Sequence, residues 1–300
     1  MFGTSFYGNQ NQWRLILDVQ TDATASFNSF EIGWDRGFIQ VNGTLEVASD
    51  FTIVASTKDF EANLLGWNSD RGVLRAGGLV KTRSGRSFLY TPRYEIGARG
   101  VRSTDNESFV VTNDHPVTVT ATADMGFYKG TNHSAQVVYV FGGTALTLDL
   151  GSHTVTNVNL VGGGGTLAVT GTGTATYDAV GGPAAISVGG DATLQIAANV
   201  VATNAMALAD GATLVLGNGA QAGIVSTPAE GAAVVRTAGG SYSAATVVPL
   251  GKLATNANVK NLMLDPVGIT LPKGFDARLK RSGDNLVLRI DKLGGVIIFR

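Results

Sequence analysis

The sequence predicts an all-β chain in which residues 141–255 stack as the coils of a parallel β-solenoid. Three observations predict this fold. Similar segments recur at a constant interval of about 20 residues, glycine or aspartate stands at one fixed position of each repeat, and Arg236 is the only basic residue between Lys129 and Lys252. Recurrence at a fixed period is typical of repeat proteins, and a continuous solenoid core keeps a nearly uncharged segment out of water. An antiparallel sandwich, which also spaces strands and turns evenly, is the alternative.

The repeat is clearest when Ala185–Ile196 is aligned with Ala205–Leu216. This alignment holds four identities: Ala185/Ala205, Ala192/Ala212, Thr193/Thr213 and Leu194/Leu214. A further step of the same length brings Val225–Arg236 into the same phase. Because successive side chains of a strand point to opposite sides, we expect Leu214 and Leu216 to point inward and Val215 outward.

One position of each repeat is predicted to be a corner between strands. That position reads Gly151, Gly171, Asp191, Gly211, Gly231 and Gly251. Glycine and aspartate tolerate the left-handed backbone that tight corners need. Since coils stack at about 4.8 Å, these corners predict a rod of roughly 25–30 Å.

The segments that flank the solenoid are also rich in strand signals. Residues 1–110 are predicted to form a compact β-rich domain of antiparallel strands, with Asn42-Gly43 as a hairpin turn. Residues 111–140 are predicted to form a strand-rich connector. Residues 256–300 are predicted to form a cap, with Ala277–Ile290 as a hairpin around Ser282–Asn285 and Val296–Phe299 as a last strand.

Charge is distributed unevenly along the N-terminal part. Leu15–Asp70 is strongly acidic, whereas Arg71–Arg102 is strongly basic and contains interleaved aromatic residues. The candidate binding or assembly residues of the basic stretch are Arg83, Arg86, Tyr90, Arg93 and Tyr94. Such a composition can grip phosphate, an acidic glycan or nucleic acid. It can equally contact the acidic stretch, within one chain or between subunits, and the near-cancellation of the two charges favours this interpretation.

Motifs for catalysis or metal binding are weak. The chain has no cysteine, and its three histidines, His115, His133 and His153, have no metal-ligand spacing, so no metal or cofactor is expected. Gly162–Gly165 is followed by neither a Lys-Ser/Thr pair nor a helix pattern, which indicates a corner rather than a phosphate loop. Asp210 and Glu230 lie one repeat apart, on neighbouring coils, and are the only candidate acid pair for glycan cleavage. Both directly precede corner glycines, so we expect them to be solvated corner residues.

Overall composition argues against two further classes. The net charge of −1 does not favour a nucleic-acid binder driven by bulk charge. No apolar run reaches the length of about 18 residues that predicts a membrane-inserted helix. The N-terminal sequence MFGTSFYGNQNQWRL does not read as a secretory signal, which favours assembly inside a cell and release by lysis, as for a virus particle.

The repeat and the terminal hairpin, preceded by a small β-rich domain, resemble bacteriophage tail fibre and tailspike proteins. The resemblance implies a homotrimeric virion protein, in which residues 1–110 attach to other virion proteins and the distal part binds the host surface, including its glycans. We therefore expect a structural virion protein rather than an enzyme. Two alternatives stay open: a secreted β-helical adhesin at the cell surface, and a polysaccharide depolymerase that acts on surface glycans.

Overall fold

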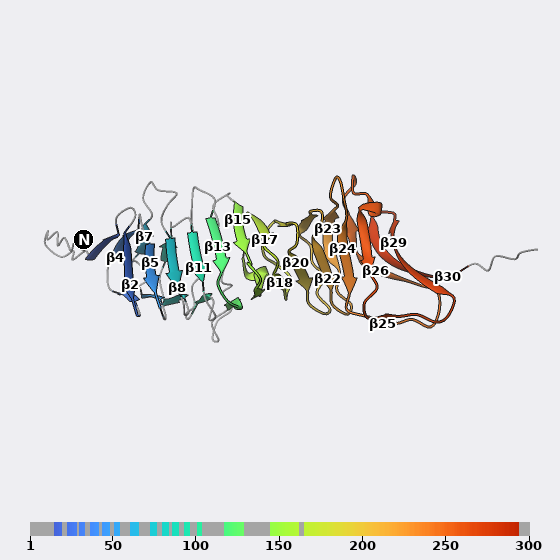
Figure 1. Cartoon of the computed structure of the whole chain (residues 1–300), viewed down its shortest axis with the longest axis horizontal. Coiled ribbons are helices and arrows are strands. Elements are labelled where there is room, and N and C mark those ends of the chain that lie inside the picture. Colours follow the sequence, from blue (N-terminus) through green and yellow to red (C-terminus); the bar gives the residue numbers. More distant parts are fainter. Residues whose placement is uncertain are drawn as a thin grey trace, which may run out of the picture.

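The computed structural model is an elongated rod of short β-strands (Figure 1). It describes residues 15–19, 23–28, 30–33, 37–41, 44–48, 51–54, 61–65, 73–76, 80–83, 86–89, 93–96, 101–103, 117–128, 145–161 and 165–293. Among these residues the only helical elements are two short 3₁₀ turns, η1 (Val158–Leu160) and η2 (Val259–Asn261). No helix in the described part of the chain is long and apolar enough to cross a membrane.

Five regular coils of about 20 residues form the shaft. Each coil contributes one strand to a 13-stranded sheet and one to an 11-stranded sheet. The strands of the first sheet are β15 (Ala145–Asp149), β17 (Thr166–Thr170), β19 (Ala185–Val188), β21 (Ala205–Leu208) and β23 (Ala222–Ser226). Those of the second are β16 (Thr154–Thr156), β18 (Thr174–Tyr177), β20 (Thr193–Ile196), β22 (Thr213–Leu216) and β24 (Ala233–Thr237). Every strand pairs in parallel with its counterpart one coil away, which confirms the predicted solenoid.

The N-terminal strands belong to the same solenoid, with three strands in each coil. They are β1 (Leu15–Val19), β2 (Thr24–Phe27), β3 (Phe30–Gly33), β4 (Gly37–Val41), β5 (Thr44–Val47), β6 (Phe51–Val54), β7 (Glu61–Leu65), β8 (Val73–Ala76), β9 (Val80–Arg83), β10 (Arg86–Leu89), β11 (Arg93–Ile96) and β12 (Val101–Ser103). The next coil holds β13 (Val117–Ala121) and β14 (Met125–Tyr128). The two large sheets take two strands from each N-terminal coil. The remaining strand, which is the first of its coil in chain order, belongs to a separate four-stranded sheet, β1-β4-β7-β10.

The antiparallel pairing predicted for the N-terminal part is wrong. The hairpin signal at Asn42-Gly43 lies outside the described residues, but the strands on its two sides belong to different sheets. β4 pairs in parallel with β1 and β7, and β5 pairs in parallel with β2 and β8. The ladder also continues across residue 110, where β11 pairs with β13. The two strands that flank this signal therefore do not form a hairpin with each other. The attachment role of residues 1–110 stays a prediction.

The core is a set of apolar columns that run along the rod. On β22, Leu214 and Leu216 are buried and Val215 is partly exposed, as predicted. Leu214 stacks between Leu194 and Val235 in the registers of the neighbouring strands. The predicted alignment of Val225–Arg236 is one residue off in each sheet, and in opposite directions. Met206 pairs with Val225 rather than Ser226, and Leu214 pairs with Val235 rather than Val234.

One buried polar cluster interrupts the apolar columns. Tyr177 is fully buried, and its hydroxyl lies within hydrogen-bond distance of the Gly181 carbonyl and the Asn204 side-chain oxygen. The Asn204 amide donates in turn to the carbonyl of Pro183. Burial raises the pKa of Tyr177, and the two hydrogen bonds act in the opposite direction. The cluster thus fixes the 178–184 loop to the coil that follows.

The corners explain why glycine recurs at one position. Gly171 has φ +89°, and a Cβ atom there would lie 2.7 Å from the Gly151 carbonyl oxygen. Left-handed dihedrals recur at the corner glycines Gly151, Gly211 and Gly231. The prediction of a corner at Gly251 is wrong, because this residue lies inside the strand Thr246–Leu253, at a break in its register. Asp191 occupies the equivalent turn, and it is not among the described non-glycine residues with positive φ, which are Asn157 and Asn199. The corner at Asp191 therefore turns without a left-handed residue at this position.

The C-terminal end of the rod is closed by an antiparallel hairpin. β26 (Thr246–Leu253) and β27 (Leu262–Asp265) are the last parallel strands of the two large sheets. β30 (Asn285–Lys292) pairs antiparallel with both β26 and β29 (Phe275–Ser282), which confirms the predicted hairpin and its turn. A side lobe pairs β25 (Gly240–Ser241) with β28 (Ile269–Thr270). The predicted last strand, Val296–Phe299, lies outside the described residues.

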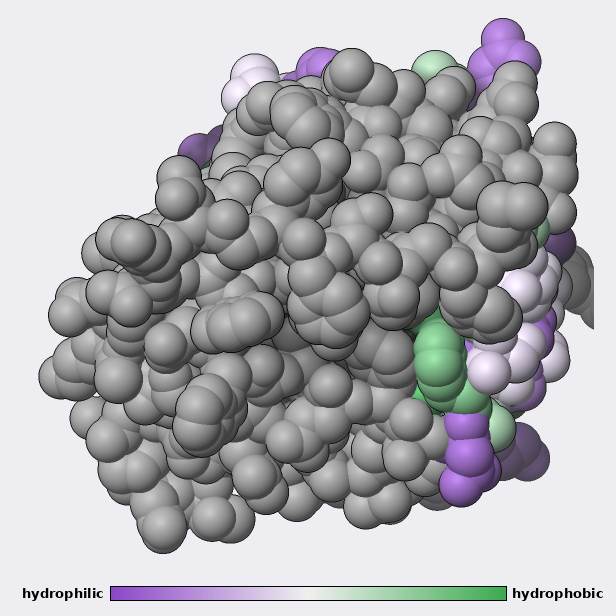
Figure 2. All heavy atoms as spheres, turned by 90° about the vertical axis from the view of Figure 1, so that its left-hand side faces the viewer, coloured by the Kyte–Doolittle hydropathy of each residue, from purple (hydrophilic) through white to green (hydrophobic). Residues whose placement is uncertain are grey.

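Both ends of the rod can be followed in the figures. β1 and β30 lie at opposite ends of the molecule (Figure 1). Figure 2 views the rod from its N-terminal end, where coloured residues are seen at the right-hand side and along the upper edge, and at the right hydrophobic residues lie beside hydrophilic ones. The two ends of the rod differ, because the N-terminal end begins with parallel strands and the C-terminal end finishes with the antiparallel hairpin.

A pair of aspartate substitutions tests the register of β22. Leu214→Asp places a charge in a fully buried column, so we expect the free energy of unfolding to fall by more than about 3 kcal/mol. Val215→Asp should cost about 1 kcal/mol or less, because this side chain faces outward beside Arg236 on the next coil. Chemical denaturation of both variants measures the difference. Equal losses would contradict the register.

Candidate binding surface on the C-terminal cap

The cap presents one flat face of three strands to the outside. Along β30, Leu286, Leu288 and Ile290 are fully buried against the end of the core. Alternate residues of a strand point to opposite faces, so Arg289 and Asp291 belong to the outer face together with Val287, which its neighbours cover to 6% exposure. Their partners on β29 are Lys280, Arg278 and Asp276, and their partners on β26 include Pro249 and Val247. These outward residues of β26, β29 and β30 define the cap face.

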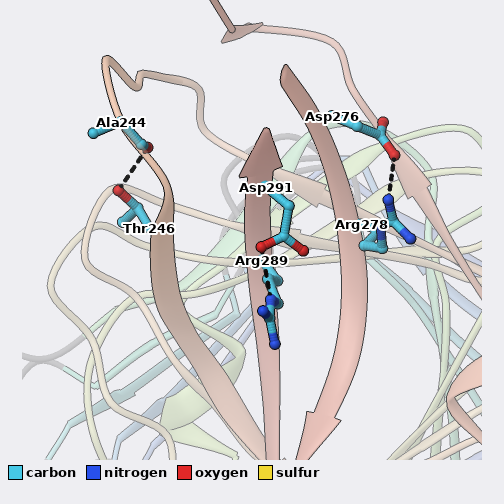
Figure 3. A network of polar contacts seen from close by, with 6 residues as sticks. All are labelled: Ala244, Thr246, Asp276, Arg278, Arg289 and Asp291. Atoms are coloured by element: carbon cyan, nitrogen blue, oxygen red, sulfur yellow. Dashed lines mark hydrogen bonds and ion pairs between the residues drawn. The ribbon is translucent and has the colours of Figure 1, made fainter. Parts of the chain in front are cut away.

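Four charges on β29 and β30 form a square on the cap face. Arg278 stands directly opposite Arg289, and Asp276 directly opposite Asp291, across the antiparallel ladder. The ion pairs instead run along each strand, as Figure 3 shows. Arg289 Nε donates to Asp291 Oδ1 at 2.9 Å, and Arg278 Nη2 lies 3.1 Å from Asp276 Oδ2. Like charges are thus neighbours between strands, and opposite charges are neighbours within strands.

The square is accessible to solvent. The side chains of Arg278, Asp276 and Arg289 are 47%, 47% and 49% exposed, and that of Asp291 is 30% exposed. The hydrogen bond from Arg289 lowers the pKa of Asp291; burial acts in the opposite direction, and the charges of Arg289, Lys280 and Arg278 lower the pKa further. The Asp291 carboxylate therefore stays ionised at pH values where an ordinary aspartate is partly protonated.

The charge of the cap contrasts with that of the shaft. Residues 246–293 contain eight basic and four acidic residues, whereas residues 145–245 contain one basic and five acidic residues. On the cap face itself, Lys280 and Lys252 add to the two arginines. The rod is therefore negative along its shaft and positive at its closed end.

Hydrogen bonds hold the cap face rigidly on the rod. Arg281 Nη2 donates to the carbonyls of Ala254 and Ala257, both at 2.8 Å, and this ties the hairpin to the loop after β26. Thr246 Oγ1 donates to the Ala244 carbonyl at 3.0 Å at the start of β26 (Figure 3). Polar groups fixed on strands keep their geometry better than groups on free loops.

The predicted acid pair is built into the corners. Asp210 is exposed, but its Oδ1 accepts a hydrogen bond from the Ala232 N–H of the next coil at 2.8 Å. The same carboxylate packs on Gly231, where a Cβ atom would come within 2.2 Å of it. Glu230 is exposed at that corner. The carboxylate of Asp210 is therefore engaged with backbone rather than aimed at a groove.

Other aspartates also accept hydrogen bonds from backbone N–H groups near corners. Asp149 accepts from the Gly151 N–H at 3.0 Å, Asp124 from the Thr154 N–H at 2.7 Å, and Asp178 from the Asn157 N–H at 2.9 Å. Each carboxylate satisfies a backbone donor that the turn removes from the ladder. Most acidic residues of the shaft are thus explained by its corners.

The predicted basic residues are placed by backbone register alone. Arg86 lies opposite Glu61 of the preceding coil, and Arg75 lies between Glu46 and Glu95. Arg83 lies opposite Val54, Arg93 between Val73 and Thr118, and Tyr94 between Leu74 and Val119. The side chains of Arg83, Arg86, Arg93 and Tyr94, and all of Tyr90, lie outside the described residues. The backbone register thus sets Arg86 and Arg75 opposite acidic residues of neighbouring coils.

The remaining sequence candidates give no site among the described residues. His153 Nδ1 lies 3.8 Å from Asp124 Oδ1, beside a corner. His115, His133 and Gly162–Gly164 lie outside the described residues. No group of three or more His, Cys, Asp or Glu side chains in the described part of the chain could hold a metal ion.

The cap face was missed by sequence reasoning, although a signal for it existed. The two-residue turn at Gly283-Asp284 fixes every cross-strand partner of the hairpin. Counting outward from Ser282 and Asn285 places Arg278 opposite Arg289 and Asp276 opposite Asp291. The opposed like charges could therefore have been found from the hairpin alone.

Substitution of Asp210 tests its corner role. Asp210→Ala removes the acceptor of the Ala232 N–H, so we expect a loss of about 1–2 kcal/mol in the free energy of unfolding. Asp210→Asn should keep most of it, because its amide oxygen can accept the same bond. Asp191→Ala is the matched control, since no hydrogen bond within the described part of the chain reaches that carboxylate. A loss in the control as large as in Asp210→Ala, measured by denaturation, would contradict this role.

Comparisons with known proteins give no family to which the chain can be assigned. No family model, no curated protein and no solved structure matches it.

Proposed function

We propose that this chain is a structural protein of a virion, a fibre, spike or decoration protein that presents a β-helical shaft to a surface. The observation that carries the proposal is the unbroken parallel ladder, which places β1 and β30 at opposite ends of one rod (Figure 1). One end can be held by a particle while the other is presented. The resemblance to phage fibres and tailspikes rests on the same repeat and hairpin.

The length and stiffness of the rod suit this role. The 13-stranded sheet holds eleven parallel strands from β2 to β26. At about 4.8 Å for each step, these strands span about 50 Å, roughly twice the length expected from the repeat alone. Backbone hydrogen bonds cross between all successive coils, so the rod resists bending. Such a rod holds its two ends a fixed distance apart.

The difference between the two ends supports an orientation. The C-terminal end is closed by the hairpin, and its cap face carries the paired charges. With β30 on the edge of β26, the 13-stranded sheet cannot be extended by a further parallel coil, so this end suits a free tip. We place the virion partner at the N-terminal coils, where Arg86 and Glu61 share a register, and a host-surface glycan at the cap.

A homotrimer is part of the proposal. The outer face of the 13-stranded sheet carries a column of small residues: Thr118, Thr147, Ala168, Ser187, Ala207 and Ser226. The column crosses six strands, so at about 4.8 Å for each step and about 15 Å of strand length it covers a face of about 360 Å². This area is less than half of the ~800 Å² that each partner contributes to a standard stable interface, so in a trimer the neighbouring faces of the rod contribute the rest. A flat strip of this kind suits the centre of a contact between neighbouring copies.

Localisation tests the virion role. Antibodies raised against the N-terminal coils and against the cap should both label intact particles purified from the native source, with the cap label farther from the particle body. Immunogold electron microscopy measures the two distances. Recovery of the chain in a cell-envelope fraction, with none in particles, would replace this proposal by the adhesin alternative.

Substitution in the flat face tests the trimer. The wild-type chain should elute at about three times its 31.0 kDa mass in light scattering. Ala207→Arg puts a long charged side chain at an exposed position of the face, so we expect a shift toward monomer. Asn218→Arg adds the same charge at an exposed corner and should leave the trimer intact. A wild-type monomer at micromolar concentration would defeat the trimer proposal.

A further inference from the structure

We propose that the cap face binds an acidic polysaccharide, with Arg278 and Arg289 holding its anionic group and Asp276 and Asp291 accepting from its hydroxyl groups. The inference deepens the proposed function and rests on it for its biological setting. The binding itself depends on the cap alone.

The order of the four charges is not the one that would best stabilise the sheet. Like charges directly opposite each other on antiparallel strands are destabilising. Two such pairs, Arg278 with Arg289 and Asp276 with Asp291, stand side by side on the cap face. Exchanging the two residues of one strand would make both cross-strand pairs attractive. The existing arrangement gives up that stability and sets two guanidinium groups next to each other.

The two guanidinium groups retain donors for a ligand. Their ion pairs engage Nε of Arg289 and Nη2 of Arg278. A guanidinium has five N–H donors, and both side chains are about half exposed. Opposed side chains have Cβ atoms about 5 Å apart, so a single carboxylate or phosphate can bridge the two arginines. Carboxylate and phosphate groups are the ligands that the arginine fork fits best.

The electric field favours an anion at this place. Lys280 and Lys252 lie on the same face. Together with the two arginines, their positive charges outweigh the negative charges of the two aspartates. The neighbouring shaft is acidic and repels anions, which concentrates them at the cap. Charge alone would attract any polyanion, so the class of polymer depends on the other groups of the face.

Those other groups favour a glycan over a nucleic acid. Single-stranded nucleic acids need aromatic platforms on which bases stack. No aromatic residue stands at an outward position of β26, β29 or β30. Beside the arginines lie two carboxylates, which accept hydrogen bonds from sugar hydroxyls and repel a phosphate backbone. Val247, 57% exposed, adds an apolar surface for the C–H groups of a sugar ring.

Binding of defined polymers to the full-length chain tests the proposal. The probes are polygalacturonate, which carries carboxylates, a phosphomannan, which carries phosphates, and as controls neutral dextran and single-stranded DNA. We expect the wild-type chain to bind at least one acidic polysaccharide, more weakly at higher salt, and neither control. The two acidic probes distinguish a carboxylate from a phosphate ligand. Failure to bind either acidic probe, or equal binding of DNA, would overturn the proposal.

Two double variants separate the cap face from general electrostatics. Arg278→Gln with Arg289→Gln should weaken binding by about tenfold or more, because charge-assisted hydrogen bonds are lost. Lys260→Gln with Lys273→Gln removes the same charge from exposed positions elsewhere on the cap and should change it by less than about threefold. Equal losses would overturn the site. Should the arginine variant fail to fold, Arg278→Lys with Arg289→Lys keeps the charge and loses the bidentate fork, so binding should still fall.

The aspartates give a test of opposite sign. Asp276→Asn with Asp291→Asn makes the cap more positive, so a purely electrostatic surface would bind acidic polymers more tightly. We expect weaker binding, because two hydroxyl acceptors are lost. Tighter binding would overturn the glycan assignment. All these readouts use purified protein, so they are independent of whether the chain is found in particles.

Discussion

The parallel hydrogen-bond ladder between successive coils is the constraint on which the rest of this molecule depends. It locks each strand to its counterpart one coil away, so side chains are selected as columns along the rod. An inward column is mainly apolar, as Leu194, Leu214 and Val235 are, and where Tyr177 enters one its hydroxyl is hydrogen-bonded. The outward column of Thr147, Ala168 and Ser187 has no core to fill and stays small. At the corners the ladder becomes irregular, and there the chain uses left-handed glycines and carboxylates that accept N–H groups left out of the ladder.

This constraint decides which acidic residues are available for chemistry. Two acidic residues that lie one repeat apart stand on neighbouring coils and have the spacing of a catalytic pair. Asp210 and Glu230 are such a pair in the sequence. The same stacking brings the Asp210 carboxylate to the Ala232 N–H, where it stabilises the turn. Spacing along a solenoid therefore predicts proximity and says little about function. The cap differs because the square of charges there lies on strand faces, away from any corner.

The sequence predicted the shaft well because its coils are nearly equal in length. Ala185 pairs with Ala205 and Thr193 with Thr213, and the identities at these positions make the repeat visible. In the N-terminal coils the successive pairs are Thr24 with Thr44, Thr44 with Val73 and Val73 with Arg93, so the middle step is much longer than the other two. Connections of unequal length hide self-similarity from an alignment at fixed period. Local turn signals then suggest hairpins, although the same residues serve equally well at the corner of a coil.

The cap solves a problem that the ladder creates. The last parallel strand leaves a row of backbone donors and acceptors exposed, and an open sheet edge invites pairing with another chain. The hairpin covers this row on β26 with β30 and leaves β29 as the new edge. Charged residues such as Arg278 and Lys280 on an edge strand oppose further pairing. Protection of the edge needs charge but not a particular order of signs. Edge protection therefore does not explain why arginine stands opposite arginine and aspartate opposite aspartate. A ligand that needs two adjacent guanidinium groups would explain this order.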